Sequence, residues 1–191
     1  MSEKDLSQRE VEIEALVKSV QNGDQEAFAK IYDVFIDPIY RYVYYRVNSA
    51  EAEDLIETVF LKAWENIKQY KHDKKSFAAW LFRIAHNLVV DHYRSSKDKV
   101  YEELNAQLPD LNRQHNPIKS TQNILDNQML KEAIGSIKRE YREIIIHKFV
   151  NELSNKEIAE VLNKSEGSLR ILQFRALKAL RNVLEEKGVN Y

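Results

Sequence analysis

The segment LSNKEIAEVLNKSEGSLRILQFRALKAL, residues 153–180, carries the strongest structural signal in the chain. Ser154 and Glu157 have the spacing of a capping box, which predicts that a helix begins immediately after Ser154. Asn163 follows the apolar residues of that helix, and asparagine tolerates the left-handed backbone that a tight turn often needs. Ser165 can then cap a second helix. Two short helices joined by such a turn are typical of a helix-turn-helix motif.

The second helix of this motif has an apolar face and a polar face. Between Lys164 and Arg181, five bases and one acid give a local net charge of +4. The beginning of such a helix enters the major groove of DNA, where base edges present a distinguishable pattern of donors and acceptors. The alternative is an ordinary solvated helix face. The side chains expected to pack inward are Leu169, Leu172, Ala176 and Leu180. The candidate DNA contacts are Ser165, Ser168, Arg170, Ile171, Gln173, Arg175 and Lys178.

The rest of the chain also has helical patterning. Only four glycines and three prolines punctuate its 191 residues, and apolar residues recur at the helical period. The predicted fold class is all-α, with two small helical domains joined by a flexible linker, the second domain ending in the helix-turn-helix. The linker is placed at residues 96–125, which are polar and contain Pro109 and Pro117. The domains are then residues 1–95 and 126–191.

Four helices are predicted in the first domain. They run from Asp24 to about Phe35, from Asp37-Pro38 to Val47, from Asn48 or Ser49 to about Ile67, and from Ser76 to about Arg94. The Asp37-Pro38 pair is interpreted as a helix cap followed by proline at the first helical position. In the second domain, helices are predicted over 127–134, 138–150, 155–162 and 166–186, with Gly135 and Asn151 as stops.

Several classes of protein are excluded by composition. The chain has no cysteine, so it has neither disulfides nor thiolate metal sites. Residues 1–20 contain no apolar run long enough for a signal peptide or a membrane span, so we expect a soluble, cytoplasmic protein without membrane insertion. None of the five histidines pairs with another at the i, i+4 spacing of a ligand pair, and no phosphate loop or nucleophile motif occurs. We therefore expect no enzyme, no metal and no cofactor.

The charge balance bears on how the protein finds DNA. With 29 basic and 30 acidic residues the net charge is −1, which is unusual for a protein that binds DNA unaided. If all five bases of the second helix met phosphates, the salt slope would be only about −4 to −5. We therefore expect a dimer partner or a larger assembly to hold the protein on DNA.

Two further stripes lie in the first domain. On the helix expected over 76–94, the residues expected to face the core are Phe77, Trp80, Leu81, Ile84 and Leu88. Arg83, Asn87 and Arg94 form a separate polar stripe on this helix, beside the basic loop KQYKHDKK at 68–75. Amide and guanidinium groups beside such a loop could hold a single strand and read a base edge. The candidates are Lys74, Lys75, Arg83, Asn87 and Arg94. An acidic and apolar stripe on the preceding helix suits either core packing or protein docking, and it consists of Asp54, Glu57, Leu61 and Trp64.

Taken together, these segments resemble a known family. AEDLIETVFLKAWENI (52–67), followed by SFAAWLFRIAHNLVVDHYR (76–94), looks like the second conserved region of the extracytoplasmic-function sigma factors of bacterial RNA polymerase, in the sigma-70 family. REYREIIIHKFVNELSNKEIAEVLNKSEGSLR (139–170) is similar to their fourth region. The resemblance covers about residues 11–95 and 126–187, in the same order as in the family.

The resemblance implies a function in promoter-specific transcription initiation. The stripe from Asp54 to Trp64 would dock on the clamp coiled coil of core RNA polymerase. The first domain would recognise and melt the −10 promoter element, with the loop at 68–75 capturing an extruded base and Asn87 contacting the same strand. The second domain would read the −35 element as duplex and contact the polymerase flap. Family members are commonly held inactive by an anti-sigma protein that clamps both domains.

This sequence departs from the family at two places. Glu57 stands where the family usually has glutamine, and Ile171 and Leu172 stand where it commonly has serine and arginine. The −35 sequence therefore cannot be transferred from a relative, although Ile171 can contact thymine methyl groups. The alternative function is that of a dimeric helix-turn-helix regulator, which accounts for the motif at 153–181 equally well and predicts palindromic sites. It does not account for the stripes of the first domain.

Overall fold

The computed structural model describes residues 3–44, 46–47, 49–72, 75–95, 129–130 and 132–189. Its helices are α1 (Glu3–Gln21), α2 (Gln25–Tyr44), α3 (Ser49–Asn66), α4 (Phe77–Ser95), α6 (Arg139–Ile145), α7 (Asn155–Leu162) and α8 (Glu166–Glu186). A 3₁₀ turn at Ile67–Gln69 follows α3, and a π-helical turn at Ile146–Val150 continues α6. Since no strand occurs in these residues, the all-α prediction is confirmed. The predicted linker at 96–125 lies outside them.

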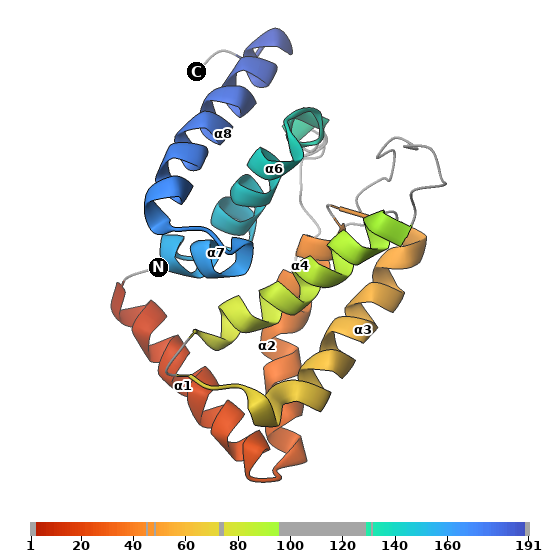
Figure 1. Cartoon of the computed structure of the whole chain (residues 1–191), viewed down its shortest axis with the longest axis vertical. Coiled ribbons are helices and arrows are strands. Elements are labelled where there is room, and N and C mark those ends of the chain that lie inside the picture. Colours follow the sequence, from red (N-terminus) through yellow and green to blue (C-terminus); the bar gives the residue numbers. More distant parts are fainter. Residues whose placement is uncertain are drawn as a thin grey trace, which may run out of the picture.

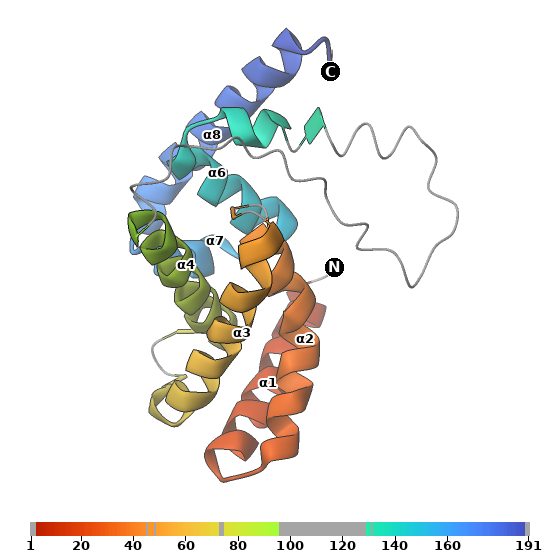
Figure 2. The same cartoon turned by 90° about the vertical axis from the view of Figure 1, so that its right-hand side faces the viewer.

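The helices form two groups that lie one above the other (Figure 1). In the lower group α1 packs on α2, and α3 packs on both α2 and α4. In the upper group α8 packs along α6 and α7. The groups meet where α4 contacts α7 and where α2 contacts the π-helical turn, which Figure 2 shows from the side. Buried apolar side chains continue from one group into the other.

The prediction that a helix begins at Asp37-Pro38 is wrong, because α2 runs unbroken through Pro38. Proline lacks the N–H that would bond the carbonyl four residues earlier, so its place inside a helix costs stability. Ile31, Phe35 and Ile39 are nevertheless fully buried along one face that spans the proline. Burial of this continuous face offsets the missing hydrogen bond, whereas two separate helices would interrupt it.

Helix α1 was not predicted, because its sequence is rich in charged residues and its apolar pattern is weak. Its last turns are fixed by tertiary contacts. Val17 and Val20 are buried, and the Gln21 amide donates to the carbonyl oxygens of Ile67 (2.8 Å) and Tyr70 (2.9 Å). After it, the predicted cap of the next helix is confirmed, since Asp24 Oδ1 accepts from the backbone N–H of Ala27 at 3.2 Å.

The amino end of α4 also follows the prediction. Ser76 Oγ accepts from the backbone N–H of Ala79 at 3.2 Å, as expected for a cap. Phe77 and Leu81 are buried in the core. The other residues of the predicted apolar face are only half-buried, and they are Trp80, Ile84 and Leu88. These three side chains therefore remain partly accessible beside α3.

The helix-turn-helix is confirmed in its local details. Ser154 and Glu157 form the capping box, and Asn163 has φ 53° and ψ 47°, the left-handed conformation expected of the turn. Ser165 accepts from the backbone N–H of Ser168 and so caps α8. Leu169 is fully buried, and so is Ala176, which lies two helical turns further along the same face of α8. These contacts hold α8 across α7.

Between the predicted linker and the motif, the chain turns twice. Gly135 does not end the preceding helix, which extends to residue 136, and the Arg142 guanidinium donates to the carbonyls of Ile134 and Gly135. Asn151 ends the π-helical turn as predicted. None of the helices in the described ranges is both long enough and apolar enough to cross a membrane.

The buried face of α8 leads to a prediction about stability. We expect Leu169→Ala to lower the free energy of unfolding by about 2–5 kcal/mol, because it opens a cavity in a fully buried position. Urea denaturation followed by circular dichroism measures the change. The matched control is Ile171→Ala, whose side chain is 56% exposed and whose loss should change stability by less than about 0.5 kcal/mol. Equal effects of the two substitutions would contradict the placement of α8.

Candidate nucleic-acid interface

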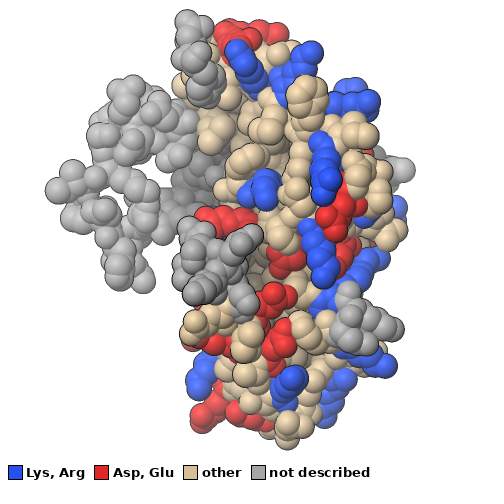
Figure 3. Space-filling view, turned by 90° about the vertical axis from the view of Figure 1, so that its left-hand side faces the viewer, with Lys and Arg blue, Asp and Glu red and all other residues tan. Residues whose placement is uncertain are grey.

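The outer face of α8 presents basic side chains to solvent. Arg170, Arg175 and Lys178 are exposed, and Ile171 lies exposed among them. Figure 3 looks onto this side of the molecule, where blue side chains recur down the α8 half among uncharged surface and a few acidic side chains. Such a surface suits phosphates on both sides of a groove, with Ile171 positioned to make apolar contact with a base edge.

Three of the predicted contacts on this helix, Ser165, Ser168 and Gln173, already have partners within the protein. Gln173 is half-buried and its amide donates to Asn155 Oδ1 at 2.9 Å, so it fixes α8 to the start of α7. Ser165 donates to Ser168 Oγ at 2.9 Å in addition to capping the helix. Leu172 packs inward against the core, so this departure from the family does not alter the exposed face.

A groove between α3 and α4 contains Asn87. Its volume is about 370 Å³, and Asn87 is exposed within it. Sequence analysis did not identify two further amides there, Asn66 and Gln69, although their spacing from Lys62 places all three on one side of the end of α3. The residues that line the groove are Lys62, Asn66, Gln69, Trp80, Ile84, Asn87, Leu88 and Asp91.

The other predicted single-strand contacts are not gathered at this groove. Arg83 instead reaches the second group of helices, where its guanidinium donates to the Glu160 carbonyl at 3.4 Å. Lys75 is half-buried, and Arg94 is exposed near Asp91, with 3.8 Å between guanidinium nitrogen and carboxylate oxygen. Lys74 lies outside the described residues. The predicted stripe is therefore divided between the groove and the contact with α7.

The acidic and apolar stripe lies together on the exposed face of α3. Asp54 and Glu57 are exposed, and so are Leu61 at 57% and Trp64 at 40%. Trp64 meets the edge of Phe28 from α2, with ring centroids 4.9 Å apart. Large exposed apolar side chains next to carboxylates are characteristic of a protein-binding surface. The alternative that Leu61 packs in the core is wrong, because its side chain is exposed.

The two groups of helices are joined by a buried cluster of polar side chains. Arg46 Nη1 lies 2.7 Å from Glu143 Oε1, and Glu143 Oε2 lies 3.3 Å from His86 Nδ1 and 3.8 Å from His147 Nε2. The Tyr42 hydroxyl is 3.1 Å from the same nitrogen of His86. Residues from α2, α4 and the α6 segment thus converge at one point between the groups.

Burial and charge set the protonation of this cluster. Burial alone would raise the pKa of Glu143, but Arg46 and the neighbouring imidazoles outweigh it and lower the pKa to about 2. For His147, burial lowers the pKa to about 3, with Arg46 acting in the same direction. Glu143 is therefore a carboxylate and His147 a neutral imidazole at neutral pH.

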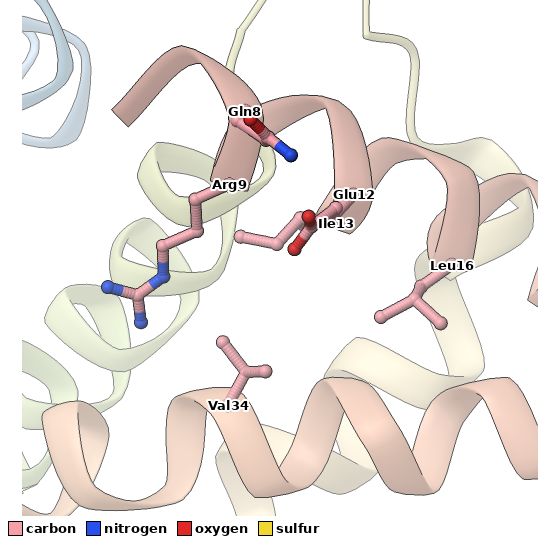
Figure 4. A pocket seen from close by; sticks show the side chains of 6 residues that line it. All are labelled: Gln8, Arg9, Glu12, Ile13, Leu16 and Val34. Atoms are coloured by element: carbon pink, nitrogen blue, oxygen red, sulfur yellow. The ribbon is translucent and has the colours of Figure 1, made fainter. Parts of the chain in front are cut away.

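A second hollow lies between α1 and α2, away from these surfaces. Its volume is about 420 Å³, and Figure 4 shows Arg9 and Glu12 beside apolar side chains of both helices. The lining residues are Gln8, Arg9, Glu12, Ile13, Leu16 and Val34. None of the candidate contacts from the sequence lines this hollow, so it has no part in the predicted interface.

Comparison with known proteins adds independent findings. Residues 31–99 match the family model for Sigma-70 region 2, and residues 127–180 match that for Sigma-70, region 4. The ECF RNA polymerase sigma factor BldN of Streptomyces coelicolor is 36% identical, over 90% of this chain and 65% of its own length. The ECF RNA polymerase sigma factor SigW of Bacillus subtilis is 32% identical, over 93% of this chain and 99% of its own.

Solved structures share the fold. CnrH, in a complex with the cytosolic domain of CnrY, superposes with a TM-score of 0.69 at 21% identity, covering 90% of this chain and 96% of that one. The sigma factor RpoE of Bartonella quintana, in a complex with the anti-sigma factor NepR, gives 0.63 at 22% identity, covering 82% and 97%.

Proposed function

This chain belongs to the extracytoplasmic-function sigma factors of RNA polymerase, and we propose that it binds core polymerase and directs initiation by reading the −35 element as duplex and melting the −10 element. The observation that carries the −10 part is the groove between α3 and α4, which is lined by Asn87 and by the neighbouring amides of Asn66 and Gln69. Unstacking a base costs a few kcal/mol, so capture in such a groove can favour strand opening without nucleotide hydrolysis. No catalytic group is required for this function.

The proposed division of labour follows the two groups of helices. Residues 1–95 form the domain that docks on polymerase and opens the −10 element, residues 96–125 form the linker, and residues 126–191 form the domain that reads the −35 element. In the second domain, phosphate contacts from Arg175 and Lys178 position α8, while Arg170 and Ile171 face base edges. The chain then acts with polymerase in the bacterial cytoplasm.

The first domain supplies the polymerase surface in this proposal. Leu61 and Trp64 provide apolar area on α3, and Asp54 and Glu57 provide charge at its rim. We assign to this surface the contact with the clamp coiled coil of polymerase. The contact with the polymerase flap is assigned to the second domain. Glu57 accepts hydrogen bonds where glutamine would both donate and accept, so it favours a basic or amide partner.

An anti-sigma protein completes the proposed set of partners. CnrH and the Bartonella RpoE are similar in fold and are each bound to another protein in their solved structures. An inhibitor that covered α8 and the α3 surface together would block both polymerase and DNA. The dimeric-regulator alternative explains the region matched at 127–180 but leaves the one matched at 31–99 without a role.

The decisive experiment is transcription in vitro with purified core polymerase on a pool of promoter fragments, with and without this protein. We expect initiation that depends on the protein and selects a subset of fragments. Stable binding of the protein alone to a palindromic duplex, without initiation, would favour the dimeric regulator instead.

Removing apolar area from the α3 surface should weaken polymerase binding. We expect Leu61→Ala to raise the dissociation constant for core polymerase at least about fivefold, which is about 1 kcal/mol, because exposed apolar side chains near the centre of an interface carry much of its energy. Fluorescence anisotropy of labelled protein measures it. Val11→Ala is the matched control, since Val11 is exposed and aliphatic but lies on α1. Unchanged affinity for Leu61→Ala would move the docking surface elsewhere.

Removing the groove amide should slow promoter opening and spare polymerase binding. We expect Asn87→Ala to reduce the opening rate roughly fivefold, corresponding to about 1 kcal/mol for one lost hydrogen bond to a captured base. Permanganate reactivity of unpaired thymines reports the opening. Asn182→Ala removes an exposed amide from α8 and should leave the rate unchanged. If Asn87→Ala opened promoters at the normal rate, Asn87 would not belong to the −10 site.

The proposed role of Arg170 is tested by comparing sequences. We expect Arg170→Ala to cost roughly 1–3 kcal/mol on a matched −35 duplex and much less on a scrambled one, as for a residue that reads a base. Competition binding of the assembled holoenzyme gives both values. Arg181→Ala serves as control, because Arg181 is exposed on the same helix and is engaged by Glu185 at 2.7 Å. Equal losses on both duplexes would assign Arg170 to phosphate contact alone.

A further inference from the structure

The cluster between the two groups of helices has the chemistry of a metal site. His86 comes from α4, Glu143 from α6 and His147 from the π-helical turn, and their nearest ligand atoms all lie within 4.8 Å of one another. Two imidazoles and a carboxylate are a common donor set for zinc and related ions. Sequence analysis considered only histidine pairs, so it could not find a set that combines residues 86, 143 and 147.

Two of the three donor separations are close to those around a small tetrahedral ion. Donor atoms around zinc stand about 2.0–2.2 Å from the metal, which places them about 3.4 Å from one another. Glu143 Oε2 is 3.3 Å from His86 Nδ1 and 3.8 Å from His147 Nε2. Shifts of a few tenths of an ångström bring these two pairs to coordination geometry, whereas the imidazole nitrogens of His86 and His147, up to 4.8 Å apart, must approach each other by as much as about 1.4 Å. Arg46 holds the other carboxylate oxygen, so Glu143 would bind through Oε2 alone.

His147 supplies the second, independent observation. Its side chain is fully buried, yet Nε2 has no hydrogen-bond partner although it points toward the Glu143 carboxylate. A buried unpaired polar atom costs about 1–3 kcal/mol. A metal ion bonded to Nε2 would remove that cost.

The other ring nitrogen is placed to support coordination. Nδ1 of His147 lies 3.4 Å from the amide nitrogen Nδ2 of Asn151, and the oxygen and nitrogen of an amide can exchange places by a half-turn of the group. If the amide presents Oδ1 to this nitrogen, Nδ1 carries the proton and Nε2 keeps its lone pair for a metal. Turning the amide breaks no other hydrogen bond of Asn151, because Oδ1 has no partner in the present orientation.

We propose that His86, Glu143 and His147 bind one divalent transition-metal ion that joins the two helical domains. The Tyr42 hydroxyl, 3.4 Å from Glu143 Oε2, orients the carboxylate. The fourth position is left to solvent, which reaches the site past His86, whose side chain is 21% exposed. The single carboxylate is already paired with Arg46, so affinity comes from imidazole nitrogen. The site therefore selects zinc-like ions over magnesium and calcium, which require oxygen ligands.

The test uses the full chain, stripped with chelator and titrated with Zn²⁺ against a fluorescent zinc indicator. We expect one equivalent to bind with a micromolar or lower dissociation constant, and millimolar Mg²⁺ not to compete. His86→Ala should weaken binding at least tenfold. His92→Ala removes another histidine from α4, one that pairs with Glu51 outside the cluster, and should bind as the unaltered chain does.

A second readout separates metal binding at this site from a folding defect. The thermal unfolding midpoint of the unaltered chain and of His92→Ala should rise with zinc concentration, because the ion binds only the folded arrangement. His86→Gln keeps a polar side chain beside Tyr42 and should fold normally but show no rise. Absence of stoichiometric binding, or equal zinc affinity in the unaltered chain and in both His86 variants, would overturn the proposal.

Discussion

The ion pair between Arg46 and Glu143 determines how the two halves of the molecule sit together. Its atoms are 2.7 Å apart and both side chains are almost completely buried, at 3% and 8% exposure. Burying either charge alone would cost several kcal/mol, so each side chain requires the other half of the protein. When the halves separate, both charges regain their hydration. The pair therefore specifies one closed arrangement without making that arrangement difficult to open.

The closed arrangement decides which surfaces are free. α4 lies between the halves, with Asn87 facing the groove beside α3 and Arg83 held by the Glu160 carbonyl of α7. Ser76, the cap of α4, also donates to Glu157 at 2.7 Å. The face of α3 and the outer face of α8 remain open. In the proposed function, a chain that engages the −10 strand with both Asn87 and Arg83 must first release Arg83 from α7.

Local signals in the sequence were sufficient for the helix-turn-helix and insufficient for the arrangement of the halves. The capping box and the left-handed turn at Asn163 depend on residues a few positions apart, so the pattern predicts them directly. The break predicted at Pro38 failed because burial of Phe35 and Ile39 outweighs a local rule. The polar cluster joins residues about a hundred positions apart, and no periodic pattern encodes that proximity. Asn66 and Gln69 were missed for a related reason, since only the packing of α3 on α4 makes their amides part of a groove.

The charge of the chain bears on how two surfaces that each bind DNA weakly can act together on a promoter. A net charge of −1 and a short basic face on α8 give little attraction for DNA, so we expect neither half to bind a promoter firmly alone. If polymerase holds both halves, each contact occurs at a high effective concentration of the other, and modest affinities multiply. That gain requires the halves to reach elements of the promoter that lie far apart. The buried Arg46–Glu143 pair makes this requirement easier to meet, because opening the interface exposes two charges that water solvates well.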